Sequence, residues 1–196
     1  GLPPTFARLL GLPLVKGFRS RFPGATIGTI EGLTATIVEW IATGRVDIGV
    51  TFNPAPSPAV DILPLFEEPM YLVSARAPRA PRAPVPLKDL PRYPLIAPSR
   101  PNANRMRIET QLAQFGLKPS IALECGGIES ILDLVREGYG HAVLPLSSLH
   151  GYGAGEGFAL RPIVKPKLSI QVSLVTSAQR PVTPLAQHVL ALIPEI

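Results

Sequence analysis

The sequence predicts an α/β protein built from two lobes, each a small layer of sheet and helix. The first observation is a repeated order of elements: TIVEWIATGRVDIGV and SILDLVREGYGHAVLP each read as a helix followed by a strand, about ninety residues apart. The second is a proline-rich stretch at 76–86 that separates the two segments. The third is composition, since 46% of the 196 residues are hydrophobic and 17% are charged, which excludes a disordered chain.

The first of the repeated segments predicts a β-α-β unit. Apolar residues recur at helical spacing from Leu33 to Ile41, and Gly44 provides a stop signal. The following residues, 46–52, alternate between apolar and polar, which predicts a strand, and the β-branched segment 26–31 predicts another strand before the helix. This order implies parallel pairing of the two strands with a right-handed crossover.

The second segment repeats this order, with strands at 120–124 and 141–145 around a helix that begins near Ile128. A further helix from Asn102 is expected to bury four apolar side chains: Met106, Ile108, Leu112 and Phe115. The remaining predicted elements are a first helix from Phe6 to Phe18, a last helix capped by Thr183, and strands at 62–66, 70–74, 95–97 and 169–176.

These elements give two lobes. Lobe I is expected to comprise residues 1–75 and 174–196, and lobe II residues 76–173. The chain would cross between them at 76–86 and again within 168–173.

The charge of the chain indicates little about the chemistry of its binding partners. The net charge of +5 favours an anionic partner, but the basic residues are scattered. The densest cluster, Arg76, Arg79 and Arg82, lies among prolines and is interpreted as a solvated connector, with nucleic-acid contact as the alternative.

No catalytic or metal-binding motif is apparent, so we expect no enzyme activity, no metal and no cofactor. The three histidines, His141, His150 and His188, are far apart in sequence, and a structural or exposed role is favoured for each. Cys125 is the only cysteine and is interpreted as a small inert residue, with pocket lining or a reactive thiol left open.

The predicted helix starts contain a set of polar groups that are candidates for ligand binding. Thr5, Thr34, Asn102 and Glu129 mark four predicted starts, and free backbone donors at such positions attract anions. Ser99 and Arg100 add a hydroxyl and a guanidinium beside Asn102, a combination suited to a small carboxylate in a cleft. The alternative is that the threonines and the asparagine only cap their helices.

The order of several motifs resembles the effector-binding domain of LysR-type transcriptional regulators over essentially the full length. The matching features are GLPPTFARLL, LVKGFRSRFPG, IEGLTATIVEWIATGRVDIGV, PLIAPSRPN and ESILDLVREGYGHAVLP. The SRPN turn is most similar to the nitrogen-assimilation-control-like branch. The resemblance implies two Rossmann-like lobes, similar to type 2 periplasmic binding proteins, with a small effector bound between them. The effector-binding residues expected from the residues and the resemblance are Thr5, Thr34, Ser99, Arg100, Asn102, Gly127 and Pro145.

The resemblance also implies partners and location. It implies a cytoplasmic homodimer, a tetramer for the longer protein, and DNA binding through a winged helix-turn-helix that nothing in this chain matches; no membrane contact is expected. The strand that precedes GLPP in the family is not matched either, so either the sheet of lobe I is expected to lack one strand or the chain begins inside that strand. A solute-binding protein of a transport system, which shares the architecture, is the alternative.

Overall fold

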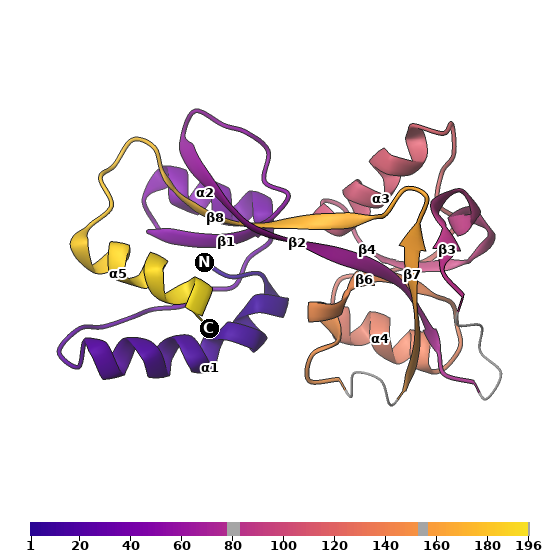
Figure 1. Cartoon of the computed structure of the whole chain (residues 1–196), viewed down its shortest axis with the longest axis horizontal. Coiled ribbons are helices and arrows are strands. Elements are labelled where there is room, and N and C mark those ends of the chain that lie inside the picture. The colour runs from indigo at the N-terminus through magenta and orange to yellow at the C-terminus, as the bar shows by residue number, and fades with distance from the viewer. Residues whose placement is uncertain (78–82, 153–156, 196) are drawn as a thin grey trace. The chain divides into compact units, whose positions relative to one another are not determined.

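The computed structural model describes residues 1–77, 83–152 and 157–195, and the chain divides into two units (Figure 1). Unit 1 comprises Gly1–Phe66 and Gln171–Ile196, and unit 2 comprises Glu67–Ile170. The predicted α/β class is confirmed. Two arginines of the predicted basic cluster, Arg79 and Arg82, lie outside the described residues.

Unit 1 combines a sheet with three α-helices. Its helices are α1 (Pro4–Arg21), α2 (Thr34–Thr43) and α5 (Pro184–Leu192), the last followed by a short 3-10 helix, η3 (Ile193–Glu195). Strand β1 (Ile48–Phe52) pairs antiparallel with β8 (Ser169–Ser177), which lies next to β2 (Val60–Ala75) in the sheet. The strand order leaves β1 at an edge.

Helix α2 packs on this sheet through a clear apolar face. Ile37 and Ile41 are fully buried and form a cluster with Val60 of β2 and Val175 of β8. The backbone of Gly49 allows this close approach, because a Cβ there would lie 2.4 Å from Cγ2 of Ile37. The helix ends at Gly44, whose φ of 84° is the left-handed conformation that glycine adopts most easily.

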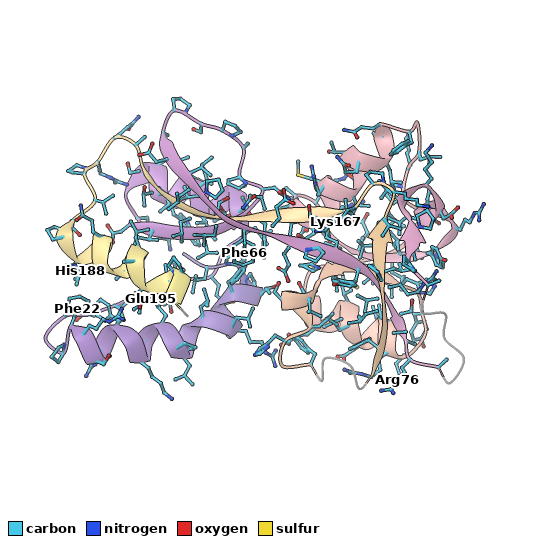
Figure 2. All side chains as sticks on the ribbon, in the orientation of Figure 1. Phe22, Phe66, Arg76, Lys167, His188 and Glu195 are labelled. Carbon is cyan, nitrogen blue, oxygen red and sulfur yellow. The ribbon has the colours of Figure 1, made fainter. Side chains whose placement is uncertain are left out.

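Helices α1 and α5 contact one another. Phe22 and His188 meet edge to face with ring centroids 5.3 Å apart, and Arg21 forms an ion pair with Glu195 at 2.7 Å (Figure 2). Thr183 caps α5 as predicted, since its hydroxyl accepts a hydrogen bond from the amide of Ala186. His188 thus has a packing role, as expected.

The described residues of unit 2 form two groups of paired strands and two α-helices. Strands β6 (Ala142–Pro145) and β7 (Phe158–Val164) both pair antiparallel with β2, and the short β3 (Val85–Pro86) pairs with β7. Strands β4 (Leu95–Pro98) and β5 (Ile121–Cys125) pair parallel. The helices are α3 (Ala103–Ala113) and α4 (Ile128–Arg136), with 3-10 turns η1 (Leu87–Arg92) and η2 (Leu146–Leu149). A buried cluster joins α4 to three strands through Ile131, Leu132, Val73, Ile96 and Leu144.

Four predictions need correction. Residues 26–31 form no regular strand: their only bridge is a parallel one from Glu31 to Leu2, so the expected direct pairing with β1 is also absent in the described residues. The predicted strands 62–66 and 70–74 are one continuous strand, β2, because Pro64 and Pro69 both have an extended backbone compatible with a strand.

The other two corrections concern a crossover and a helix face. The chain passes between units within β2, at Phe66–Glu67, whereas the predicted crossover at 76–86 lies inside unit 2. The second passage, at Ile170–Gln171, falls within the predicted range. In α3, Met106 is exposed, because the buried face runs through Arg105, Ile108 and Leu112 instead, and Phe115, also exposed, lies just after the end of the helix.

Candidate functional site

Three strands of unit 2 end at one edge. Strand β5 lies parallel to β4, and His141, directly before β6, forms a parallel bridge with Leu95 of β4. Parallel strands bring their carboxyl ends to the same side of a sheet, where α/β proteins bind ligands. Residues 99–102 follow β4, residues 126–127 follow β5, and residue 145 is the last of β6. This edge therefore holds five of the seven predicted site residues: Ser99, Arg100, Asn102, Gly127 and Pro145.

The turn after β4 holds most of the polar groups. The amide of Ser99 donates to the carbonyl of Cys125 at 3.2 Å, which joins the ends of β4 and β5 and leaves the Ser99 side chain exposed. Asn102 caps α3: its Oδ1 accepts hydrogen bonds from the amides of Asn104 and Arg105 at 3.0 and 3.2 Å. The capping alternative is therefore true for Asn102.

Arg100 already has a partner. Its Nη2 lies 2.8 Å from Oε2 of Glu109, and the Arg100 side chain is 64% exposed. An ion pair this exposed is weak, so an anion of suitable geometry can compete with Glu109 for the guanidinium.

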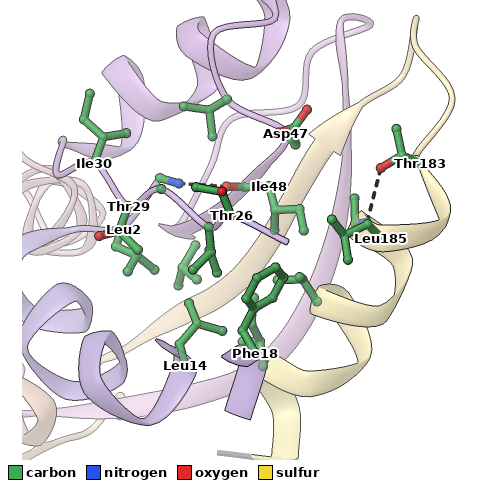
Figure 3. A pocket seen from close by; sticks show the side chains of 18 of the residues that line it. Leu2, Leu14, Phe18, Thr26, Thr29, Ile30, Asp47, Ile48, Thr183 and Leu185 are labelled. Carbon is green, nitrogen blue, oxygen red and sulfur yellow. Dashed lines mark hydrogen bonds between the residues drawn. The ribbon is translucent and has the colours of Figure 1, made fainter. Parts of the chain in front are cut away.

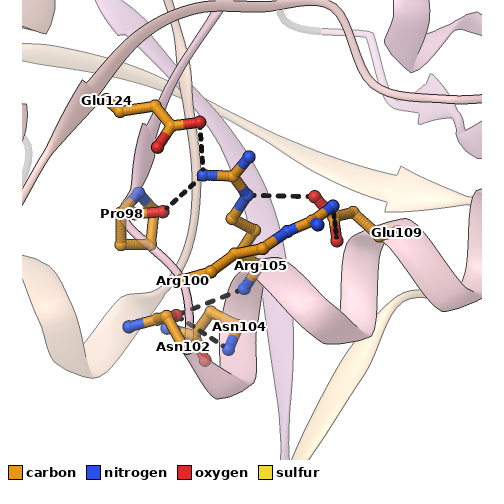
Figure 4. Close-up of polar contacts among 7 residues, drawn as sticks. All are labelled: Pro98, Arg100, Asn102, Asn104, Arg105, Glu109 and Glu124. Carbon is orange, nitrogen blue, oxygen red and sulfur yellow. Dashed lines mark hydrogen bonds and ion pairs between the residues drawn. The ribbon is translucent and has the colours of Figure 1, made fainter.

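Sequence reasoning missed a second arginine, Arg105, which is buried beneath this turn (Figure 4). Its Nε donates to Glu109 at 2.9 Å, and its Nη1 donates to the carbonyl of Pro98 at 3.1 Å and lies 2.8 Å from Glu124. The three acceptors come from α3, the end of β4 and β5. Arg105 therefore holds the turn against both strands. The i, i+4 spacing of Arg105 and Glu109 was the available signal.

The charges of this cluster shift two pKa values. Burial of Glu109 opposes ionisation, but hydrogen bonds from Arg100 and Arg105, with their positive charges, hold the pKa of the Glu109 carboxyl below its ordinary value. The hydrogen bond to Glu109 raises the pKa of Arg105, against the opposing effect of burial. Both groups are ionised at neutral pH.

The starts of α4 and η2 complete the edge. Gly127 is the N-cap of α4 and has open space around it, whereas Glu129, predicted to mark that start, lies in the first turn and accepts a hydrogen bond from the Tyr152 hydroxyl at 2.8 Å. Pro145 is buried at the end of β6 and is the N-cap of η2. Cys125 is half-buried at the end of β5.

The other two predicted site residues, Thr5 and Thr34, lie in unit 1. The Thr34 hydroxyl accepts from the amide of Phe52 at 3.1 Å and lies 3.2 Å from its carbonyl, so it joins the start of α2 to the end of β1. Phe52 also contacts Phe6 of α1, with centroids 5.3 Å apart. Thr5, half-buried in the first turn of α1, therefore lies at the same edge as Thr34.

Neither threonine caps its helix. The N-caps are Pro3 and Leu33, and neither makes a side-chain capping bond. Because the single Thr34 proton faces the Phe52 carbonyl, its hydroxyl is occupied within unit 1 and keeps one lone pair for a ligand donor.

His141 is part of a separate polar cluster of unit 2. Its Nδ1 lies 2.7 Å from the Ser74 hydroxyl, and its ring packs edge to face on Tyr93. Burial, and then the charge of Arg161, lower the pKa of His141. This agrees with the structural role favoured from the sequence.

Neither metal-binding nor membrane-spanning features were found in the part of the chain that the structure describes. It holds no group of three or more His, Cys, Asp or Glu side chains that could bind a metal ion. Of the helices described, none has the length and apolar character needed to cross a bilayer.

The fold and the two strand edges define a class of effector-binding domain, and comparison with known proteins identifies the family. Residues 1–195 match the family described as LysR substrate binding domain, and the chain belongs to it. The prediction made from the sequence motifs is confirmed.

Among curated relatives, the nitrogen assimilation regulatory protein nac of Escherichia coli K12 is 30% identical over 195 residues, which cover 97% of this chain and 62% of that protein. The nac protein of Klebsiella aerogenes is 28% identical, covering 95% of this chain and 61% of the relative. The chain thus spans about three fifths of the length of these relatives.

Solved structures support the fold. The effector-binding domain of QuiR in complex with shikimate has a TM-score of 0.84 at 20% identity, covering 98% of this chain and 92% of that one. The regulatory domain of Synechocystis PCC6803 CcmR in complex with 2-PG has a TM-score of 0.86 at 17% identity, covering 99% of this chain and 93% of the other.

Proposed function

We propose that this chain is the effector-sensing domain of a LysR-type transcriptional regulator and that its effector is a small organic anion held at the strand edge of unit 2. The observation that carries the proposal is the convergence of the ends of β4, β5 and β6, where the amide of Ser99 bonds to the carbonyl of Cys125, just before the start of α4, and Arg100 follows Ser99 in the same turn. Ligand complexes of QuiR and CcmR support a small-molecule effector in principle.

Each residue of the edge has a distinct role in this proposal. Arg100 exchanges Glu109 for the carboxylate or phosphate of the effector, and the exposed Ser99 hydroxyl donates a hydrogen bond to it. Asn102 keeps the first turn of α3 in place, and Gly127 leaves room for the ligand at the start of α4. Thr5 and Thr34 are proposed as further effector contacts from unit 1, on the family resemblance.

Family membership supports a proposal about partners and location. We propose a homodimer, a tetramer for the longer regulator, a cytoplasmic location, and DNA binding through a part of the protein other than this chain. No catalytic step is proposed.

A thermal-shift screen of small carboxylates and phosphate esters tests the function. A ligand at 100 times its Kd stabilises the native state by about 2.7 kcal/mol, which is readily measured as a rise in Tm. The panel is run on the parent chain, on Arg100→Gln and on the control Arg92→Gln. Arg92 is equally suited as a control because it is exposed, lies in unit 2 and pairs with one carboxylate, that of Asp89.

We expect an anion that raises the Tm of the parent and of Arg92→Gln, with affinity for Arg100→Gln lower by about 10- to 100-fold. An anion that binds Arg100→Gln as tightly as the parent contradicts the role of Arg100. A response only to uncharged ligands contradicts the anionic effector.

A further inference from the structure

His141 lies where the two groups of paired strands of unit 2 meet. Within the described residues, the pair β4–β5 is joined to the sheet of β2, β6 and β7 by one bridge, between Leu95 and His141. The amide of His141 donates to the carbonyl of Pro94 at 2.9 Å, and its carbonyl accepts from the amide of Ile96 at 2.7 Å. The alignment of β4 with β6 therefore depends on this residue.

The ring of His141 adds side-chain contacts to this backbone link. Its Nδ1 lies 2.7 Å from the hydroxyl of Ser74 on β2. The ring also meets Tyr93, just before β4, edge to face with centroids 5.3 Å apart. All three side chains are half-buried. One residue thus holds the start of β6 to β2 through its ring and to β4 through its backbone.

A positive charge lies beside this ring. Arg161 of β7 donates from Nη1 to the Tyr93 hydroxyl at 3.0 Å, and its guanidinium carbon lies 5.5 Å from the centroid of the Tyr93 ring. The polar groups packed around His141 are therefore a hydroxyl from β2, a phenol before β4 and a cation from β7. No acidic side chain of the described residues forms an ion pair with the ring.

We propose that His141 is an acid-sensitive link, whose neutral ring holds β6 to β2 and β4 and whose protonated ring loosens β4 from β6. A neutral ring with its proton on Nε2 accepts the Ser74 proton at Nδ1. In a protonated ring both nitrogens donate, so the Ser74 hydroxyl has to reverse its hydrogen bond, and a second cation is placed beside Arg161. Burial, and then the charge of Arg161, lower the pKa of His141, which is the direction expected when the charged ring fits poorly.

The link lies on the strands that lead to the proposed effector edge. Strand β4 runs from Leu95 to Pro98, directly before Ser99, and β6 ends at Pro145. Loosening of the bridge at Leu95 therefore reduces the order of the turn after β4, and an effector held there is released in acid. This consequence rests on the proposed function, whereas the acid-sensitive link itself does not.

The pH dependence of stability tests the link without a ligand. Stability from the neutral ring is fully present above the ordinary pKa of 6.5 and is lost as the pH falls through the lower folded value. From about pH 7.5 to about pH 5, the Tm of the parent should fall by at least about 2 °C more than that of His141→Asn. Asparagine keeps a hydrogen-bonding amide near the place of Nδ1 but takes up no proton. His150→Asn is the control, because His150 is an exposed histidine of the same unit, and should fall as the parent does.

The amino terminus also changes charge in this range. The Gly1 ammonium donates to the carbonyl of Ile48 at 2.8 Å, beside a pocket of about 460 Å³ in unit 1 (Figure 3), and burial lowers its pKa to about 6. This group is common to the parent and the variants. The difference between their Tm values therefore reports on His141.

Hydrogen exchange and NMR locate the effect. From about pH 7.5 to about pH 5, the amides of Ile96 and Ser99 should lose at least about threefold more protection than the amide of Asn53, which bonds within unit 1. His141→Asn should remove this difference. Arg161→Gln, which retains the histidine, should move the NMR titration of the His141 ring to higher pH, because a neighbouring cation is removed.

Four outcomes would count against the proposal. Equal falls of Tm in the parent and in His141→Asn, or unchanged protection of Ile96 in the parent, would overturn the link. A ring that titrates at the same pH in the parent and in Arg161→Gln would also overturn it, and this measurement holds even if His141→Asn does not fold. Protection lost at Ile96 but kept at Ser99 would overturn the consequence for the effector edge. Because no effector enters these measurements, their failure would leave the proposed function to its own test.

Discussion

At the scale of single residues, Arg105 is the group on which the turn after β4 depends most. It is buried and bonds to Glu109, Glu124 and the carbonyl of Pro98, so it fixes the path of the chain just before Ser99. Removal of the guanidinium leaves the Pro98 carbonyl and part of each carboxylate without a donor. Buried polar groups that lose a partner cost about 1–3 kcal/mol.

We therefore expect Arg105→Met to lower the free energy of unfolding by about 1–3 kcal/mol, measured by urea denaturation. Arg92→Met is the control, because an exposed arginine with one ion pair should contribute within about 0.5 kcal/mol. If both variants lost the same stability, Arg105 would have no special role in the turn.

Glu109 makes the same cluster sensitive to acid. Its pKa is lowered in the folded protein, so the unfolded chain takes up the proton first as the pH falls. Stability from this group is fully present above the ordinary carboxyl pKa of 4.5 and is lost as the pH falls through the lower folded value. Loss of Tm below pH 4.5 should be shallower in Glu109→Gln than in the parent. An unchanged slope in Glu109→Gln would contradict the ionised carboxylate.

At the scale of helices and strands, local sequence predicts some elements correctly, whereas tertiary packing determines others. Helical spacing of apolar residues and the glycine stop correctly predicted α2, and the alternation of apolar and polar residues correctly predicted β1. In both cases the pattern lies within the element itself. The segment 26–31 has the composition of a strand but forms only one bridge, since a strand needs a paired neighbour along its length. The register of α3 was also misjudged. An arginine, Arg105, lies on the buried face; its i, i+4 spacing to Glu109 indicates an ion pair but does not show that the pair is buried.

Part of the candidate site could likewise be predicted from the sequence, and part of it could not. The turn at 98–102 and the start of α4 could be placed from the order of strands and helices, because parallel strands must end at a common edge. The hydrogen-bond partners of Arg100 and Thr34 could not be predicted from the sequence. Glu109 and the backbone of Phe52 approach these side chains only through tertiary packing.

The contact between α2 and β1 gives a prediction at this scale. Gly49→Ala places a Cβ 2.4 Å from Cγ2 of Ile37, so we expect a loss of about 1–3 kcal/mol in the free energy of unfolding. The double variant Gly49→Ala with Ile37→Ala should lose less than the sum of the single changes, because the second change removes the clashing atom. Gly126→Ala, with open space around it, is the control. Strict additivity in the double variant would contradict this packing.

At the scale of the whole molecule, several large apolar side chains remain exposed on one helix of each unit. Leu12 of α1 is 63% exposed and Met106 of α3 is 53% exposed, while Phe115, just after α3, is partly covered by the ammonium of Lys88. Exposed apolar residues on α1 and α3 are what the expected homodimer requires, with α1 of one copy against α3 of the other. In a two-fold symmetric interface each such contact occurs twice.

We expect light scattering at about 100 μM, a concentration at which weak interfaces of this kind still assemble, to give twice the chain mass of 20.9 kDa. Leu12→Glu and Met106→Glu should each give 20.9 kDa, because one substitution introduces a charge into both copies of the contact. Leu63→Glu is the matched control, since Leu63 is 59% exposed but lies on β2. Tm values close to that of the parent would show that the variants remain folded. A parent chain that is monomeric at this concentration, or a Leu63→Glu variant that dissociates as fully as Leu12→Glu, would mean that α1 and α3 do not form the interface.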